Sequence, residues 1–254
     1  MLRRSRELFA DILRQTDLVL LALCAAASLF GVLMVASATR YMHTWRLVAV
    51  QSVALLLGVV LYLVISQIDL NDLCKYWKWI FLVGVVGILL LVTPLGIADN
   101  TGNRAWLDFP FLPVKVQPAE IVKLTLTLVL AKQLVWLKEN RDLSSIPSIL
   151  FLAAHLGVIF VLYYKVSSDM GSALVFLFIF ACMCFVGGVA LRWFLLGGMT
   201  GGLAFWALWD LNKIPSYMKL RFQVLFDHSL DPQDTGWQQT RSPMALGSGK
   251  LTGQ

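Results

Sequence analysis

Long apolar runs separated by short polar segments dominate the hydrophobic pattern of this chain. The hydrocarbon core of a bilayer is about 30 Å thick, so a helix that crosses it needs roughly 20 apolar residues. Runs near this length recur, and we expect helical spans at residues 17–38, 47–66, 79–96, 119–137, 149–164, 171–190 and 193–209. The pattern therefore predicts an all-α polytopic membrane protein with about seven transmembrane helices.

Composition supports the membrane prediction, because 58% of the 254 residues are hydrophobic and only 14% are charged. Ordinary soluble domains carry about 25% charged residues. Lys and Arg exceed Asp and Glu, but they are scattered between apolar runs and do not form a basic patch with interleaved aromatic residues. We therefore exclude nucleic acid as a partner. No metal-like spacing joins the cysteines, which we expect to be packing residues: Cys24, Cys74, Cys182 and Cys184.

The distribution of basic residues predicts the orientation of the chain. With a cytoplasmic N-terminus, the inner segments hold Arg3, Arg4, Arg6, Arg14, Lys75, Lys78, Lys132, Lys138, Arg141 and Arg192. The outer loops before the tail hold fewer, namely Arg40, Arg46, Arg104, Lys115 and Lys165. Positive charge is enriched in cytoplasmic loops, so we expect the N-terminus to be cytoplasmic.

Three regions follow from this layout. Residues 1–16 form a basic amphipathic segment, expected to lie as a short helix on the cytoplasmic leaflet. Residues 17–209 form the membrane domain, with an outer loop at 97–117. Residues 210–254 begin a large extracytoplasmic loop.

The loop at 97–117 and the helix after it carry charges that need an explanation. The loop mixes turn residues with apolar ones, so we expect a structured re-entrant or interfacial loop. Pro118 suits the first position of a helix, and Glu120 lies where a carboxylate can meet free backbone amides. Lys123 is one turn further on and can pair with Glu120. Because charges within spans are costly, the pair indicates either a functional cavity or a purely structural contact.

Further polar residues belong to the same predicted face of the membrane. Asp169 precedes the sixth span, where an Asp is a common helix cap, and it could either meet Glu120 and Lys123 or be an isolated cap. Arg104 with Trp106 suits a phosphate-bearing amphipathic ligand, although Trp106 alone is equally consistent with an interfacial anchor. The glycines near the end of the chain lack the spacing of a phosphate-binding loop.

Four blocks in order resemble the SEDS family of shape, elongation, division and sporulation proteins, which includes RodA, FtsW and SpoVE. Residues 102–107 resemble its Gly-x-Arg-x-Trp loop, and residues 117–123 resemble its Gln-Pro-Ser-Glu-x-x-Lys helix start, with Ala119 in place of Ser. Residues 169–174 resemble its Asp-Leu-Gly-Thr-Ala-Leu block, although Ser-Ser precedes it here instead of Gln-Pro. Residues 236–239, followed by residues 245–253, resemble its large outer loop.

The resemblance implies a ten-helix fold that polymerises lipid II, an undecaprenyl-diphosphate-linked disaccharide pentapeptide, together with a class B penicillin-binding transpeptidase. It implies a bacterial cytoplasmic (inner) membrane location and a role in cell wall synthesis, cell shape or division. It also implies that the substrate-binding residues are Arg104, Trp106, Glu120, Lys123 and Asp169. A divalent cation, Mg or Mn, would be compatible with that chemistry, but the sequence assigns no metal ligand.

In the family, the catalytic Asp lies in a His-Thr-Asp-Phe-like segment after the outer loop, beyond Gln254 in this numbering. We therefore expect these residues to be a truncated portion of the fold without polymerase activity of their own. Two other functions stay open from the sequence: a lipid II flippase or transporter, and a non-catalytic scaffold for the penicillin-binding protein. Charges at outer helix starts, as at Glu120 and Asp169, favour the transferase over a transporter with charges at the bilayer midplane.

Overall fold

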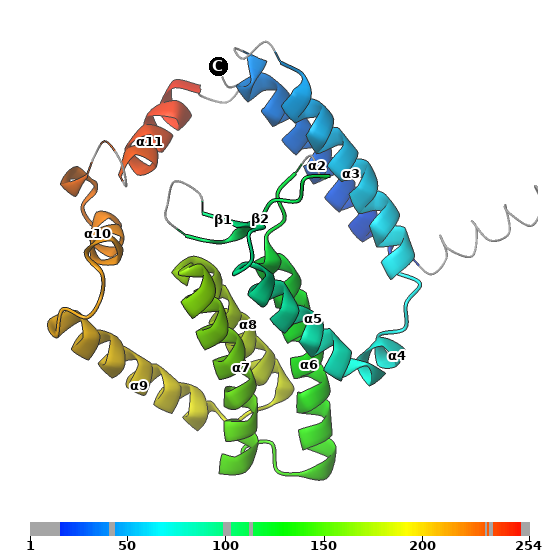
Figure 1. Ribbon diagram of the computed structural model, residues 1–254, viewed down its shortest axis with the longest axis vertical. Helices are drawn as coiled ribbons and strands as arrows, with labels where there is room; N and C mark the ends of the chain where they lie inside the picture. Colours follow the sequence, from blue (N-terminus) through cyan, green and yellow to red (C-terminus); the bar gives the residue numbers. More distant parts are fainter. Residues whose placement is uncertain are drawn as a thin grey trace, which may run out of the picture. The chain divides into compact units, whose positions relative to one another are not determined.

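The structure is a computed structural model that describes residues 16–40, 44–98, 103–111, 114–231, 233 and 236–249 (Figure 1). The predicted amphipathic segment lies outside the described residues, apart from its last residue, Thr16. Two short strands are present, β1 (Gly96–Ile97) and β2 (Trp106–Leu107), and one 3-10 helix, η2 (His228–Leu230). The α-helices are α2 (Leu18–Ala38), α3 (Arg46–Ile65), α4 (Leu70–Lys75), α5 (Trp77–Leu90), α6 (Pro118–Asn140), α7 (Ile146–Ser167), α8 (Met170–Gly187), α9 (Leu191–Asp210), α10 (Ser216–Val224) and α11 (Trp237–Gly249).

Each of the seven predicted spans coincides with a helix, namely α2, α3, α5, α6, α7, α8 and α9. Within the described residues, four of them are long and apolar enough to cross a membrane by length and composition: α2, α3, α7 and α8. The prediction for the third span, 79–96, was wrong at its end, because α5 stops at Leu90. Pro94 explains the early end, since proline has no amide hydrogen to donate and disfavours helical backbone in the residue before it.

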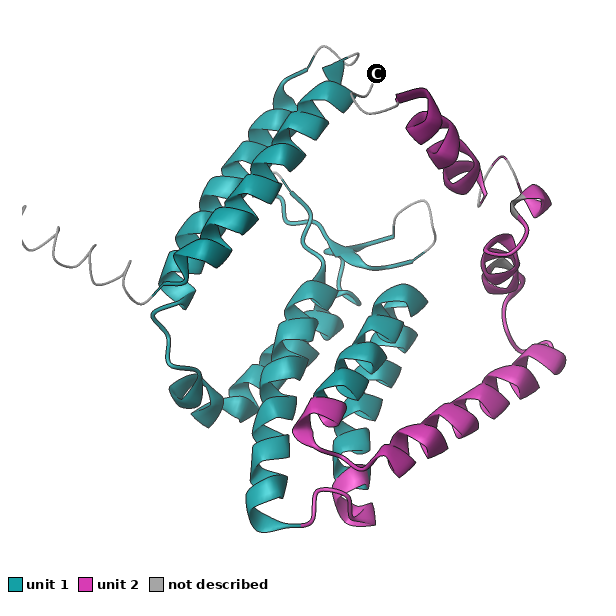
Figure 2. Cartoon of the chain, turned by 180° about the vertical axis from the view of Figure 1, so that it is seen from behind, with its two compact units in different colours: residues 1–141, 150–183 teal, residues 142–149, 184–254 magenta. Residues whose placement is uncertain are grey.

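The chain divides into two compact units, shown in Figure 2. The first contains residues 1–141 and 150–183, and the second contains residues 142–149 and 184–254.

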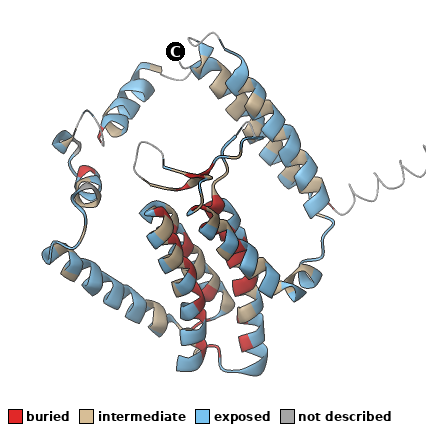
Figure 3. Ribbon diagram, viewed as in Figure 1, coloured by how far each residue is buried: buried red, intermediate tan, exposed pale blue. Residues whose placement is uncertain are grey.

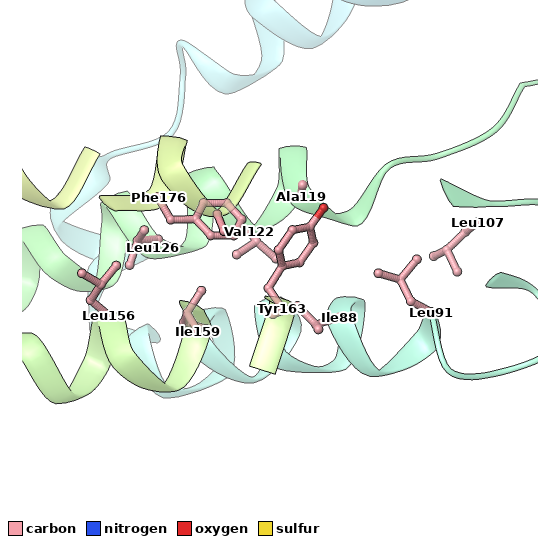
Figure 4. Close-up of a cluster of buried hydrophobic side chains, with 11 residues drawn as sticks. Ile88, Leu91, Leu107, Ala119, Val122, Leu126, Leu156, Ile159, Tyr163 and Phe176 are labelled. Carbon is pink, nitrogen blue, oxygen red and sulfur yellow. The ribbon is translucent and has the colours of Figure 1, made fainter. Parts of the chain in front are cut away.

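A buried core holds α5, α6, α7 and α8 together within the first unit. Its side chains form one cluster, drawn in Figure 4: Ile88, Leu91, Leu107, Ala119, Val122, Leu126, Leu156, Ile159, Tyr163, Ala173 and Phe176. α5 and α6 approach closely, since a Cβ on Gly84 would lie 2.5 Å from Thr125 Oγ1. The end of α5 reaches the start of α6, where a Cβ on Gly87 would lie 3.8 Å from Pro118 Cβ. The bundle thus brings the end of α5 and the start of α6 together.

The first unit also contains α2 and α3, two consecutive helices that pack against each other as a helical hairpin. Asp17 caps α2 by accepting from the amides of Val19 and Leu20, and the Tyr62 hydroxyl donates to the Asp17 carbonyl at 3.1 Å. Neither helix contains a buried residue, and Figure 3 shows both without the red of the bundle. Their surfaces are apolar and accessible, as expected of helices that face lipid.

The second unit is organised around two local contacts. Ser144 ties the segment 142–149 to the start of α9, because its Oγ accepts from the Ala190 amide and its carbonyl accepts from Trp193 Nε1, each at 2.9 Å. At the other end of α9, rings of α9 and α10 gather around Phe222. In the described part of the tail, residues 237–249 are helical, so they do not form a phosphate-binding loop.

Candidate functional site

The linker between α5 and α6 is folded into a small hairpin. β1 and β2 pair antiparallel, with Gly96 opposite Leu107 and Ile97 opposite Trp106, and a further bridge joins Leu107 to Val116. The Arg104 amide donates to the Ser167 carbonyl at 3.0 Å, so the hairpin is attached to the end of α7. The linker is therefore structured, and it brings its polar residues to the end of the bundle where α6 and α8 begin.

Arg104 is fixed by the backbone of its own linker. Its Nε donates to the Gly96 carbonyl and its Nη2 donates to the Thr93 carbonyl, both at 3.0 Å. Gly96 is needed for this approach, because a Cβ there would collide with the Leu91 carbonyl and lie 3.0 Å from Arg104 Nε. A guanidinium has five N–H donors, and the other three have no acceptor among the described residues. Arg104 is also half-buried, so partial burial and the two hydrogen bonds together hold its guanidinium in one position.

Trp106 lies in β2, two residues from Arg104, and is half-buried. Arg104 and Trp106 are both half-buried, whereas Ala105 between them and Leu107 after them are buried. In the described part of the chain, the Trp106 ring makes no aromatic or cation–π contact. Trp106 is also absent from the cluster of buried side chains that includes its neighbour Leu107.

Glu120 and Lys123 form an ion pair on the first turn of α6, with Lys123 Nζ 2.7 Å from Glu120 Oε1. Pro118 occupies the first turn of this helix, and Glu120 is its acidic first-turn residue. The Lys123 side chain is 27% exposed and that of Glu120 is 62% exposed. The ammonium is thus the more sheltered partner, and the carboxylate holds it at the helix start.

Asp169 caps the start of α8 in the turn after α7. Its Oδ2 accepts from the Ser172 hydroxyl at 2.6 Å and from the Tyr163 hydroxyl at 3.1 Å, while its Oδ1 accepts from the Ser172 amide at 3.3 Å. Ser168 has a φ of 57°, a left-handed conformation that is uncommon for residues other than glycine. The turn is therefore held in a specific shape by its neighbours.

The structure thus brings together some of the predicted site residues. Glu120 and Lys123 pair with each other, and the Arg104 backbone reaches the residue two before Asp169. Among the described residues, no hydrogen bond or ion pair connects Asp169 with Glu120 or Lys123. A meeting of all three charges stays a prediction.

Sequence reasoning missed two residues at this site, Tyr163 and Ser172. Ser172 carried a usable signal, because it stands three residues after Asp169, where a capping side chain meets backbone amides. Tyr163 carried none, since it lies in an apolar run and has the spacing of a core residue. The described residues also contain no group of three or more His, Cys, Asp or Glu side chains that could hold a metal ion.

Fold and site together define a polytopic, all-α membrane protein with a polar site where several of its helices begin and end. The profile of the FtsW/RodA/SpoVE family, described as cell cycle proteins, matches residues 15–254. The chain belongs to this family, which is the family indicated by the four sequence blocks.

Relatives and solved structures agree with the family. The chain is 31% identical over 245 residues to a probable peptidoglycan glycosyltransferase FtsW of Saccharophagus degradans, covering 93% of this chain and 61% of that protein. It is 32% identical over 252 residues to the corresponding protein of Tolumonas auensis, covering 94% of this chain and 61% of that one.

Among solved structures, a chain of a peptidoglycan synthase complex matches with a TM-score of 0.76 at 30% identity, covering 93% of this chain and 66% of that one. The rod shape determining protein RodA of Thermus thermophilus matches with a TM-score of 0.57 at 31% identity, covering 74% of this chain and 59% of that one. The chain spans less than two thirds of the length of these relatives.

Proposed function

We propose that this chain carries the lipid II binding part of a peptidoglycan glycosyltransferase. Arg104 is the observation that supports this proposal most directly. The residue is half-buried, its guanidinium is fixed by two carbonyls, and its other N–H groups have no acceptor among the residues that the structure describes. Charge-assisted hydrogen bonds from Arg suit phosphate oxygens, and a lipid diphosphate presents such oxygens next to a long apolar chain.

Each residue of the site has a part in this proposal. In glycan polymerisation, a sugar hydroxyl attacks the anomeric carbon of a lipid-linked donor, the new C–O bond forms, and the lipid diphosphate departs. Arg104 and Lys123 would stabilise the negative charge of the departing diphosphate. Glu120 would hold the Lys123 ammonium in place, and Trp106 would pack against the amphipathic donor.

A carboxylate must accept the proton of the attacking hydroxyl. The family resemblance assigns that role to an Asp beyond residue 254, so Asp169 is proposed here only as a binding residue. The proposal includes a location in the bacterial cytoplasmic membrane and a class B penicillin-binding protein as partner. The likeness to a chain of a peptidoglycan synthase complex supports that partner.

Binding of lipid II tests the proposal without requiring catalysis. The full chain would be placed in lipid nanodiscs and titrated with fluorescently labelled lipid II. We expect Arg104→Ala and Lys123→Ala each to weaken binding by about tenfold, because each removes a charge-assisted contact to the diphosphate. Lys78→Ala is the control, because this lysine lies in the first turn of α5. The candidate site lies near the other end of α5, where Gly87 approaches Pro118.

Unchanged affinity in both Arg104→Ala and Lys123→Ala would overturn the proposal. Transferase and flippase activities can be separated with the complete reading frame that contains these residues. Glycan chains formed from lipid II in detergent, where no second leaflet exists, would support the transferase. Movement of lipid II across a vesicle membrane without glycan formation would support the transporter.

A further inference from the structure

Tyr163 combines complete burial with a polar contact to the candidate site. The residue is 0% exposed, and its ring meets the Phe176 ring edge-on at a centroid distance of 5.2 Å. Figure 4 shows its hydroxyl end directed toward Ala119, the neighbour of Glu120 and a member of the same buried cluster. The ring is therefore fixed between α6 and α8, and it carries its hydroxyl to the Asp169 carboxylate.

The two oxygens of Asp169 have different surroundings. Oδ2 accepts from two hydroxyl groups, those of Tyr163 and Ser172, at 3.1 and 2.6 Å. Among the described residues, Oδ1 accepts a single long bond, 3.3 Å, from the Ser172 amide. Ionised carboxylate oxygens can each accept more than one hydrogen bond, so Oδ1 keeps accepting capacity. Asp169 as a whole is half-buried, so part of the residue remains exposed.

The carboxylate is also not neutralised by a cation. Within the described residues, its hydrogen-bond partners are hydroxyl and amide groups, and no Lys or Arg lies within ion-pair distance of it. The two hydroxyl donors are neutral, so they orient the carboxylate without neutralising its negative charge. The turn that holds it contains the left-handed Ser168, which costs about 1 kcal/mol or more for such a residue. Such costs are retained where neighbouring contacts determine the backbone.

We propose that Tyr163 is a positioning residue for ligand binding. Its hydroxyl holds Oδ2 of Asp169, so that Oδ1 accepts a hydrogen bond from an O–H or N–H group on the sugar portion of a lipid-linked glycan. This inference rests on the proposed function, because it requires a ligand that carries sugars. It differs from the roles of Arg104 and Lys123, which address the diphosphate.

Two probes test the inference with the full chain in nanodiscs: labelled lipid II, which carries sugars, and undecaprenyl diphosphate, which carries none. We expect Tyr163→Phe to weaken lipid II binding by about three- to tenfold and to leave undecaprenyl diphosphate binding unchanged. The ring and its contact with Phe176 are kept in this variant, and only the hydroxyl donor is lost. Tyr164→Phe is the matched control, since its hydroxyl has no hydrogen bond among the described residues.

The pair Tyr163→Phe and Asp169→Asn completes the test. If Tyr163 acts through Asp169, adding Tyr163→Phe to Asp169→Asn causes little further loss of lipid II affinity. Equal losses for both probes, or fully additive losses, would show a merely structural role and overturn the inference. Wild-type lipid II affinity in Tyr163→Phe would also overturn it. The proposed function fails separately, through unchanged binding of both probes in Arg104→Ala and Lys123→Ala.

Discussion

The α2–α3 pair and the α5–α8 bundle are both apolar in sequence, yet they are stabilised in different ways. α2 and α3 contain no buried residue, and the polar contacts between them join the start of α2 to the end of α3: Thr16 with Ser66, and Tyr62 with the Asp17 carbonyl. The bundle has a continuous buried core and a polar contact between α6 and α7, at Gln133 and His155. Figure 3 shows the contrast in the buried residues of the bundle.

This difference shows which residues distinguish packed helices from lipid-facing ones. Lipid is as apolar as leucine, so hydrophobicity alone does not drive helices together in a bilayer. Close packing and interhelical hydrogen bonds do. The bundle has both, at Gly84 against Thr125 and at Gln133 with His155, whereas α2 and α3 have glycines with open space around them.

The largest expected effect is the loss of a core ring. Phe176→Ala removes a side chain that is 0% exposed and contacts Tyr163, so we expect the free energy of unfolding to fall by about 3 kcal/mol. Phe30→Ala is the matched control in α2, where the side chain is 64% exposed, and we expect almost no change. Denaturation in detergent micelles followed by circular dichroism measures both. Equal losses at the two positions would contradict the comparison.

The length of the apolar runs predicted where the helices lie, because each span must satisfy its backbone internally and must be long enough to cross the bilayer. The same signal failed at the end of the third span. Residues 91–96 continue the apolar run of the predicted span. The helix α5 nevertheless ends at Leu90, because Pro94 and the hairpin that starts at Gly96 follow it. Local backbone chemistry therefore overrode hydrophobicity at this position.

The candidate site was predictable where local spacing determines the contact. Glu120 and Lys123 are three residues apart on a helix, and their ion pair follows from that spacing. Arg104 was identified as a polar residue, but its partners Gly96 and Thr93 depend on the fold of the linker. Tyr163 was not identified, because a buried tyrosine in a span cannot be told from a core residue until the turn at Asp169 is placed beside its hydroxyl.

Close approach between α5 and α6 gives the next largest prediction. Gly84→Ala places a Cβ 2.5 Å from Thr125 Oγ1, so either the Thr125 side chain must rotate away from its bond to the Val122 carbonyl or the helices must separate, and we expect a loss of about 2 kcal/mol. Gly58→Ala is the control in α3, where nothing lies within 4 Å of the added Cβ. There we expect no loss, because alanine favours helix more than glycine does. The same micelle denaturation applies, and equal tolerance at both glycines would show that α5 and α6 are not in close contact.

The smallest effect should come from the polar contact between α6 and α7. His155 is buried and its Nδ1 lies 2.8 Å from Gln133 Oε1, and because a carbonyl oxygen only accepts, Nδ1 carries the proton. Gln133→Leu leaves that N–H without an acceptor in an apolar site, and we expect a loss of about 1 kcal/mol. Gln51→Leu in α3 is the control, since Gln51 is exposed and we expect no loss there.

The double variant Gln133→Leu/His155→Leu separates hydrogen bonding from packing at this position. It removes both polar partners, and His155 Nε2 has no hydrogen-bond partner in the described residues, so the double variant also removes a buried unsatisfied atom. We therefore expect the double variant to be more stable than Gln133→Leu alone. If the stability loss of the double variant equals the sum of the losses of the two single variants, the two side chains contribute through packing and not through their hydrogen bond. The bundle would then differ from the α2–α3 pair by packing alone.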